Sequence, residues 1–193
     1  RHRRNFDQDH EGTDITFGTL TGYPCCFSNM HQGWPKFTQH LWYATPDNGI
    51  AAFSYSPSEV TAKVGNNVSV VISEDTYYPM DNRISFTIKE VKNKTKQVEF
   101  PLHLRIPKWC KRAEIIVNGK AEQYIEGGRI AVINRIWKRN DNVELHLPME
   151  VSTSTWYENA VTIERGPLVY ALKIKENWKK ENLNNSWYGP HYY

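Results

Sequence analysis

Residues from about 49 to 175 alternate between apolar and polar side chains with a period of two. The longest run has Val98, Phe100, Leu102, Leu104 and Ile106 separated by polar residues or proline. Shorter runs of the same kind occupy 84–88 and 143–147. Alternation places one face of a strand on a core and the other toward water, which is typical of antiparallel sheet. The pattern predicts a mainly β fold, an antiparallel β-sandwich, with a barrel as the alternative.

Local signals refine this pattern at two places. Asn118-Gly119 follows an apolar run and predicts a hairpin, because both residues accept positive φ. Ahead of the strands, Phe37 and Leu41 are spaced for one helix face, which predicts a short helix over roughly 34–44. The turn residues 45–49 would end that helix. The polar stretch after residue 175 is interpreted as a tail or linker.

Composition excludes several classes of protein. The chain has 193 residues and a formal net charge of +3, a balance too mild for a nucleic-acid partner. No apolar run approaches the ~18 residues of a transmembrane helix, so no membrane association is expected. Aromatic residues make up 13% of the chain, which argues against disorder. The start has neither Met nor an apolar signal region, so we expect a piece of a longer chain.

The neighbouring cysteines at positions 25 and 26 are the sharpest chemical feature. A thiolate is a strong nucleophile and a soft Zn²⁺ ligand, but two cysteines supply at most half of a four-ligand site. His31 and His40 are candidates for the remaining ligands. The alternative is a pair of small buried residues. Cys110 is interpreted as an inert structural thiol.

Two other groups of residues leave alternatives open. The acidic cluster of Asp7, Asp9, Glu11 and Asp14 is either a solvated segment or a source of paired carboxylates for glycoside hydrolysis. Tryptophans are either core residues or platforms on which sugar rings stack. The tryptophans in question are Trp34, Trp42, Trp109, Trp137 and Trp156.

A series of motifs resembles the C-terminal part of glycoside hydrolase family 127, the β-L-arabinofuranosidase-like proteins. The series covers roughly residues 22–172, and its order is more specific than any one motif. It comprises Cys25-Cys26 with Asn29, then 74–79 (EDTYYP), 100–109 (FPLHLRIPKW), 117–119 (VNG), 135–141 (RIWKRND) and 164–170 (ERGPLVY).

The resemblance implies an (α/α)6 barrel that carries the active site, followed by the β-sandwich. Residues 1–48 would be the end of that catalytic barrel, 49–175 the sandwich and 176–193 the tail. By position, Cys25 would be the catalytic nucleophile of a retaining glycosidase. Cys25 and Cys26 would be the thiolates of a zinc site whose other ligands, a Glu and a Cys, lie upstream. The general acid/base Glu would also lie upstream.

The expected function is therefore a part of a retaining glycoside hydrolase, inactive by itself, that acts with the rest of its barrel on a carbohydrate substrate. Phe27-Ser28 stand where characterised members have two prolines, and the run 33–37 (GWPKF) indicates a divergent subgroup. Its substrate would be an L-arabinofuranoside, a related pentose or an acidic sugar. The alternative is a carbohydrate-binding or structural sandwich with no catalytic role. The cysteine pattern leaves the compartment open, and a secreted or periplasmic location fits the parent protein.

Overall fold

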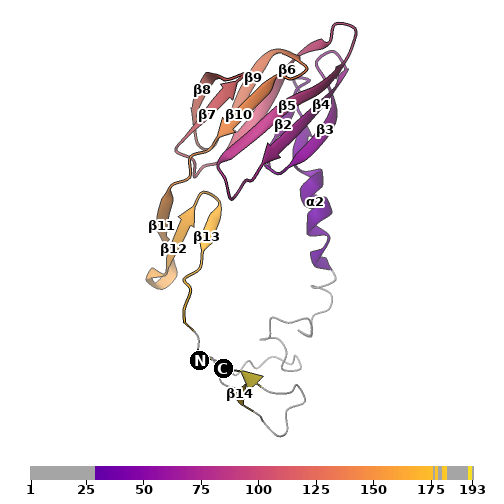
Figure 1. The fold of residues 1–193 in the computed structure, drawn as a ribbon. Helices are drawn as coiled ribbons and strands as arrows, with labels where there is room; N and C mark the ends of the chain where they lie inside the picture. Colours follow the sequence, from indigo (N-terminus) through magenta and orange to yellow (C-terminus); the bar gives the residue numbers. More distant parts are fainter. Residues whose placement is uncertain (1–28, 176, 178–179, 182–190, 193) are drawn as a thin grey trace. The chain divides into compact units, whose positions relative to one another are not determined.

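The computed structural model describes residues 29–175, 177, 180–181 and 191–192. Most of these residues lie in a compact unit that spans Gln32–Tyr170. Its centre is a pair of sheets that share one hydrophobic core (Figure 1). The predicted mainly β, sandwich-like fold is therefore confirmed. The domain boundaries at 48/49 and 175/176 stay predictions.

The first sheet has the order β1-β2-β6-β9 and the second the order β3-β4-β5-β10-β7-β8. All pairs are antiparallel except β2 with β6, which run parallel. The strands of the first sheet are β1 (Trp42–Ala44), β2 (Ile50–Ala52), β6 (Gln97–Ile106) and β9 (Arg129–Lys138). Those of the second are β3 (Ser58–Val64), β4 (Val68–Thr76), β5 (Arg83–Lys92), β7 (Arg112–Val117), β8 (Lys120–Glu126) and β10 (Asn142–His146).

The core is built from the apolar members of the alternating runs. In β6 every second residue from Val98 to Ile106 is buried, and β5 and β10 show the same alternation. Trp137 from β9 is fully buried, and its indole N–H donates to the backbone oxygen of Phe100 at 2.9 Å. The ring is therefore buried with its apolar surface removed from water and its one polar atom hydrogen-bonded. The period-two pattern thus identified the core-facing positions correctly.

The predicted helix is shorter than expected. Helix α2 (Gly33–Gln39) ends at Gln39 with His40 as its C-cap, and residues 42–44 form strand β1 instead. The prediction was wrong for 40–44 because 45–49 is a hairpin turn that pairs β1 with β2. Asn48 has a φ of 58° in this turn. The Trp42 ring meets Phe86 edge-to-face at 5.8 Å, so packing and strand pairing together override helical spacing.

The predicted Asn118-Gly119 hairpin is confirmed and has a second role. Both turn residues have positive φ, 50° and 76°, and they join β7 to β8. The Asn118 side chain donates to the buried carboxylate of Asp141 at 3.0 Å and accepts from the backbone N–H of Asn142 at 2.8 Å. The β7–β8 turn is therefore tied to the turn that precedes β10.

Smaller elements complete the described residues. A three-stranded meander contains β11 (Val151–Thr155), β12 (Val161–Arg165) and β13 (Leu168–Tyr170), with a 3-10 turn at Tyr157–Asn159. Strands β14 (Lys180–Glu181) and β15 (His191–Tyr192) pair with each other and belong to a separate unit. Among the described residues, no helix has the length and apolar character needed to cross a membrane.

A close backbone contact gives the first stability prediction. A Cβ at Gly127, in the β8–β9 turn, would lie 2.1 Å from the Cys110 oxygen and 2.6 Å from the Pro107 oxygen. Backbone atoms cannot move aside as a flexible side chain can. We expect Gly127→Ala to lower the free energy of unfolding by about 1–3 kcal/mol, the usual cost of overpacking, in urea denaturation.

Gly33→Ala is the matched control, because a Cβ there meets nothing within 4 Å. It should change the free energy of unfolding by less than about 0.5 kcal/mol. Equal stability of the two variants would show that the β8–β9 turn is not packed against residues 107–110.

Candidate functional site

The cysteines that carry the sequence-based site lie outside the described residues. The zinc and nucleophile assignments of Cys25 and Cys26 therefore stay predictions, and so does the acidic cluster at 7–14. His31 and His40 are described and exposed. Within the part of the chain that the structure describes, no group of three or more His, Cys, Asp or Glu residues could hold a metal ion.

Several buried polar groups of the described residues, Glu74 and Tyr55 among them, lie where the chain crosses from the first sheet to the second. This crossover segment, Phe53–Pro57, connects β2 to β3. Its Tyr55 is 3% exposed and packs edge-to-face against Tyr78 and Phe86. The Tyr55 hydroxyl donates to the backbone oxygen of Arg105 at 2.6 Å. Burial raises the pKa of this phenol far above its ordinary range, so it stays a neutral donor.

Arg105 makes the reciprocal contact. It ends the outward-facing row of β6, and its Nε–H donates to the backbone oxygen of Phe53. The side chains of Tyr55 and Arg105 thus each bond to a backbone carbonyl of the opposite segment. The crossover is held at the end of β6 by two hydrogen bonds that run in opposite directions. We call this pair the crossover clasp.

Glu74 holds the same segment from the other sheet. It lies in β4, is 3% exposed, and accepts from the backbone N–H of Ser56 at 2.9 Å. The Ser58 hydroxyl lies 3.4 Å from its second oxygen and accepts in turn from the Trp42 indole N–H at 3.0 Å. Burial raises the pKa of Glu74 to about 8, against weaker lowering by Ser56 and Ser58. The carboxyl group is therefore largely protonated at neutral pH.

Residues after β4 complete the packing around Tyr55. Tyr78 lies beside the Tyr55 ring at 5.8 Å, and its backbone N–H donates to the Thr76 hydroxyl at 2.9 Å. Burial raises the pKa of the Tyr78 phenol, while the charge of Arg105 opposes that shift. Both phenols and Glu74 are therefore neutral, and Arg105 is the charged member of the cluster. This composition suits positioning of Arg105 better than proton transfer.

An open hollow of about 680 Å³ lies beside Arg105. Pockets of roughly 300–1,000 Å³ are the size that holds small ligands. The walls combine apolar side chains with three cationic side chains. They also include Gly128, the second glycine of the β8–β9 turn. The lining residues are Phe53, Arg105, Ile106, Pro107, Lys108, Gly128, Arg129 and Ile130. We call this the Arg105 hollow.

The outward face of the first sheet carries a second polar contact. His103 lies two residues before Arg105, and its Nε2 lies 2.9 Å from a carboxylate oxygen of Asp47 in the β1–β2 turn. Thr45 donates to the other oxygen of Asp47. These contacts, that of Thr45 first, lower the pKa of Asp47. The pairing of His103 with Asp47 was not predicted from the sequence.

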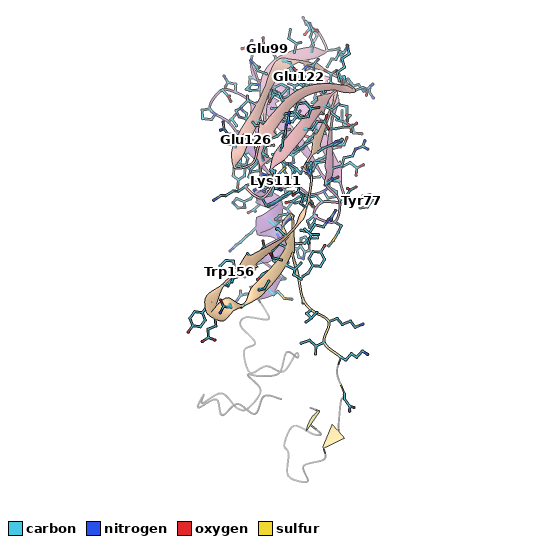
Figure 2. The ribbon with its side chains drawn as sticks, turned by 90° about the vertical axis from the view of Figure 1, so that its left-hand side faces the viewer. Tyr77, Glu99, Lys111, Glu122, Glu126 and Trp156 are labelled. Atoms are coloured by element: carbon cyan, nitrogen blue, oxygen red, sulfur yellow. The ribbon has the colours of Figure 1, made fainter. Side chains whose placement is uncertain are left out.

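The five tryptophans were interpreted either as core residues or as platforms for sugar rings, and the structure shows both buried and exposed ones. Trp137 is fully buried, and Trp42 and Trp109 pack against the core. Trp34 and Trp156 are exposed by 74% and 65%, and Trp156 lies at the turn between β11 and β12 (Figure 2). Three of the five are therefore structural.

Cys110 is a buried free thiol whose pKa is raised by burial, consistent with a structural role.

Sequence reasoning missed the roles of Tyr55 and Glu74 in this cluster. Tyr55 stands in a short segment without periodicity. Glu74 belongs to the motif at 74–79, but the resemblance implies no role for that residue. A usable signal was present for Glu74. It occupies a core-facing position of β4, two residues after Ile72. An acid in that row must be neutral or bonded when buried.

Glu74 makes stability depend on pH. The folded pKa of about 8 lies above the ordinary value of 4.5, so the folded state keeps a proton that the unfolded state has lost between these values. The contribution is complete below pH 4.5 and is lost as the pH rises toward 8. Glu74→Gln should remove up to about 1.4 kcal/mol per pH unit from the slope of unfolding free energy across this window.

Urea denaturation at several pH values measures that slope. Glu59→Gln is the matched control, because Glu59 is an exposed carboxylate on the neighbouring β3. It should leave the slope of the wild-type chain unchanged. An identical slope in the wild type and Glu74→Gln would contradict a protonated Glu74.

Comparison with known proteins identifies the family of this chain. Residues 49–149, just over half of the chain, match the family described as "Beta-L-arabinofuranosidase, GH127 middle domain". No curated protein sequence matches. A GH127 β-L-arabinofuranosidase from Geobacillus stearothermophilus T6 is similar in structure, with a TM-score of 0.66 and 28% identity over 77% of this chain.

Two further solved structures agree. A protein titled "Glycoside hydrolase" has a TM-score of 0.65 and 27% identity, and covers 81% of this chain. The GH127 β-arabinofuranosidase BT3674 has a TM-score of 0.64 and 22% identity, and covers 77% of this chain, a likeness of fold alone. This chain covers only 24%, 28% and 26% of the respective structures. The chain belongs to the GH127 β-L-arabinofuranosidase family, with residues 49–149 matching its middle domain.

Proposed function

We propose that this chain forms part of a retaining glycoside hydrolase and supplies its nucleophile, Cys25. The observation that carries the proposal is the match of residues 49–149 to the GH127 middle domain, in a chain that covers about a quarter of a β-L-arabinofuranosidase. The Cys25-Cys26 pair precedes that domain. The proposed substrate is an L-arabinofuranoside or a related sugar.

The proposed reaction proceeds in two displacements at the anomeric carbon. The Cys25 thiolate attacks this carbon, a carbon–sulfur bond forms, and the glycosidic carbon–oxygen bond breaks. The departing oxygen takes a proton from an acid outside this chain. Water then displaces the sulfur from the opposite face, gives its proton to the same group and regenerates the thiolate. Two inversions retain the anomeric configuration.

A zinc ion would keep Cys25 ionised at neutral pH. Thiolates are preferred zinc ligands, and coordination deprotonates a thiol outright. Cys25 and Cys26 would supply two ligands, and the remaining ones would come from outside this chain. This requirement explains why the 193-residue chain should be inactive alone. The middle domain would then serve as the structural support of the barrel.

The first test concerns the nucleophile. The 193-residue chain should not hydrolyse a chromogenic L-arabinofuranoside. In a longer protein that joins this chain to its catalytic barrel, Cys25→Ala should lower kcat at least about a thousandfold, because the attacking group is lost. Cys110→Ala, which removes a buried thiol of the sandwich, should retain turnover. Full activity of the Cys25 variant would refute the proposal.

The second test concerns the metal. Cys26→Ser should reduce the zinc content of the same longer protein, measured by atomic absorption after gel filtration, because a hydroxyl is a much poorer zinc ligand than a thiolate. Cys110→Ser is the matched substitution and should leave the zinc content at the wild-type level. Equal zinc in wild type and Cys26→Ser would remove Cys26 from the ligand set.

A further inference from the structure

The Arg105 hollow collects positive charge without a lining acid. Arg105, Lys108 and Arg129 contribute three cations, and none of the lining residues is Asp or Glu. Arg129, at the start of β9, pairs loosely with Glu126 at 3.7 Å, and both side chains are exposed. Glu126 lies at the end of β8 (Figure 2). Exposed pairs of this kind are weak and leave both groups accessible. The electrostatic preference of the hollow is therefore for an anion.

Arg105 is the group that most needs such an anion. Its side chain is partly buried, yet none of the salt bridges between described residues includes it. Partial burial of an unpaired charge costs free energy that a bound counter-charge recovers. Its Nε–H is already used in the crossover clasp, which fixes the guanidinium at the hollow. Among the described residues no hydrogen bond involves its two Nη groups, which could therefore hold a planar, two-oxygen partner such as a carboxylate.

The remaining walls restrict what else the ligand can contain. Phe53 and Ile130 contribute apolar side chains, and Ile130 is 48% exposed, whereas the Ile106 side chain is buried in the core. Gly128 has no side chain to block the rim, and the nearest atoms to a Cβ there would be those of Lys108 at 3.9–4.0 Å. An apolar wall next to a cation suits a sugar ring, whose C–H face packs on apolar side chains while its substituents make polar contacts.

We propose that the Arg105 hollow binds the carboxylate of a uronic acid residue in a saccharide. Arg105 would hold the carboxylate through its Nη groups, and Lys108 would add charge at the rim. The apolar wall of Phe53 and Ile130 would contact the ring. The choice of a saccharide rests on the proposed glycosidase function, whereas the preference for a carboxylate rests on the hollow itself. The site would let the middle domain hold an acidic glycan.

Titration of the intact 193-residue chain with trigalacturonate, followed by NMR or calorimetry at low salt, tests the proposal. The fully methyl-esterified trisaccharide is the matched ligand, because it keeps the sugar rings and removes the charge. We expect saturable binding of trigalacturonate and binding at least about tenfold weaker for the ester, the usual effect of losing a charged hydrogen bond. Equal binding of the two would overturn the proposal.

Three variants locate the site. Arg105→Gln should weaken binding at least about tenfold, and Lys108→Gln roughly two- to fivefold, because the rim charge is solvent-exposed. Lys89→Gln removes an exposed charge from β5 and should change nothing. Lys108 is exposed and takes part in no ion pair between described residues, so its variant stays informative if Arg105→Gln is unstable. Unchanged binding in both hollow variants would refute the assignment.

Other ligands separate the two parts of the proposal. Acetate that competes as tightly as trigalacturonate, or an acidic hexapeptide that binds more tightly, would overturn the saccharide assignment. None of these measurements involves Cys25 or turnover. The uronate site is tested by binding, and the glycosidase proposal is tested by hydrolysis in the longer protein. A failure of one proposal can therefore be told apart from a failure of the other.

Discussion

The crossover clasp between Tyr55 and Arg105 is the constraint on which the described site depends. The chain must leave the first sheet after β2 and enter the second at β3, and its backbone polar groups need partners at that corner. Tyr55 donates to the Arg105 carbonyl, and Arg105 donates to the Phe53 carbonyl. Glu74 receives the Ser56 N–H from the opposite sheet. One corner thus joins both sheets and fixes a cation at the surface.

This arrangement relates stability to binding through a single side chain. Arg105 closes the corner with Nε and also lines the hollow. Neutral neighbours, the protonated Glu74 among them, leave its charge uncompensated from inside the fold. Under the proposed glycosidase function, such a cation would have a carbohydrate partner. The middle domain would then both support a catalytic barrel and bind an acidic glycan.

Most of the fold could be predicted from the sequence, because period-two alternation determines which side chains are buried. The rows at 84–88, 98–106 and 143–147 all face the core, and Asn118-Gly119 forms its turn. The helix over 40–44 was mispredicted because three residues of strand pairing outweigh a weak helical spacing. The contacts that hold Arg105 were beyond prediction, since they join residues about 50 positions apart through backbone carbonyls that have no sequence signature.

A double-mutant cycle on the clasp tests the central claim most directly. Tyr55→Phe and Arg105→Gln each remove one of the two opposed hydrogen bonds, so the free energies of unfolding of the single and double variants report whether they act together. Our account predicts a coupling of at least about 0.5 kcal/mol, as expected for residues that hold the same two segments. Strictly additive effects would contradict a shared clasp and leave Arg105 without the anchor proposed for it.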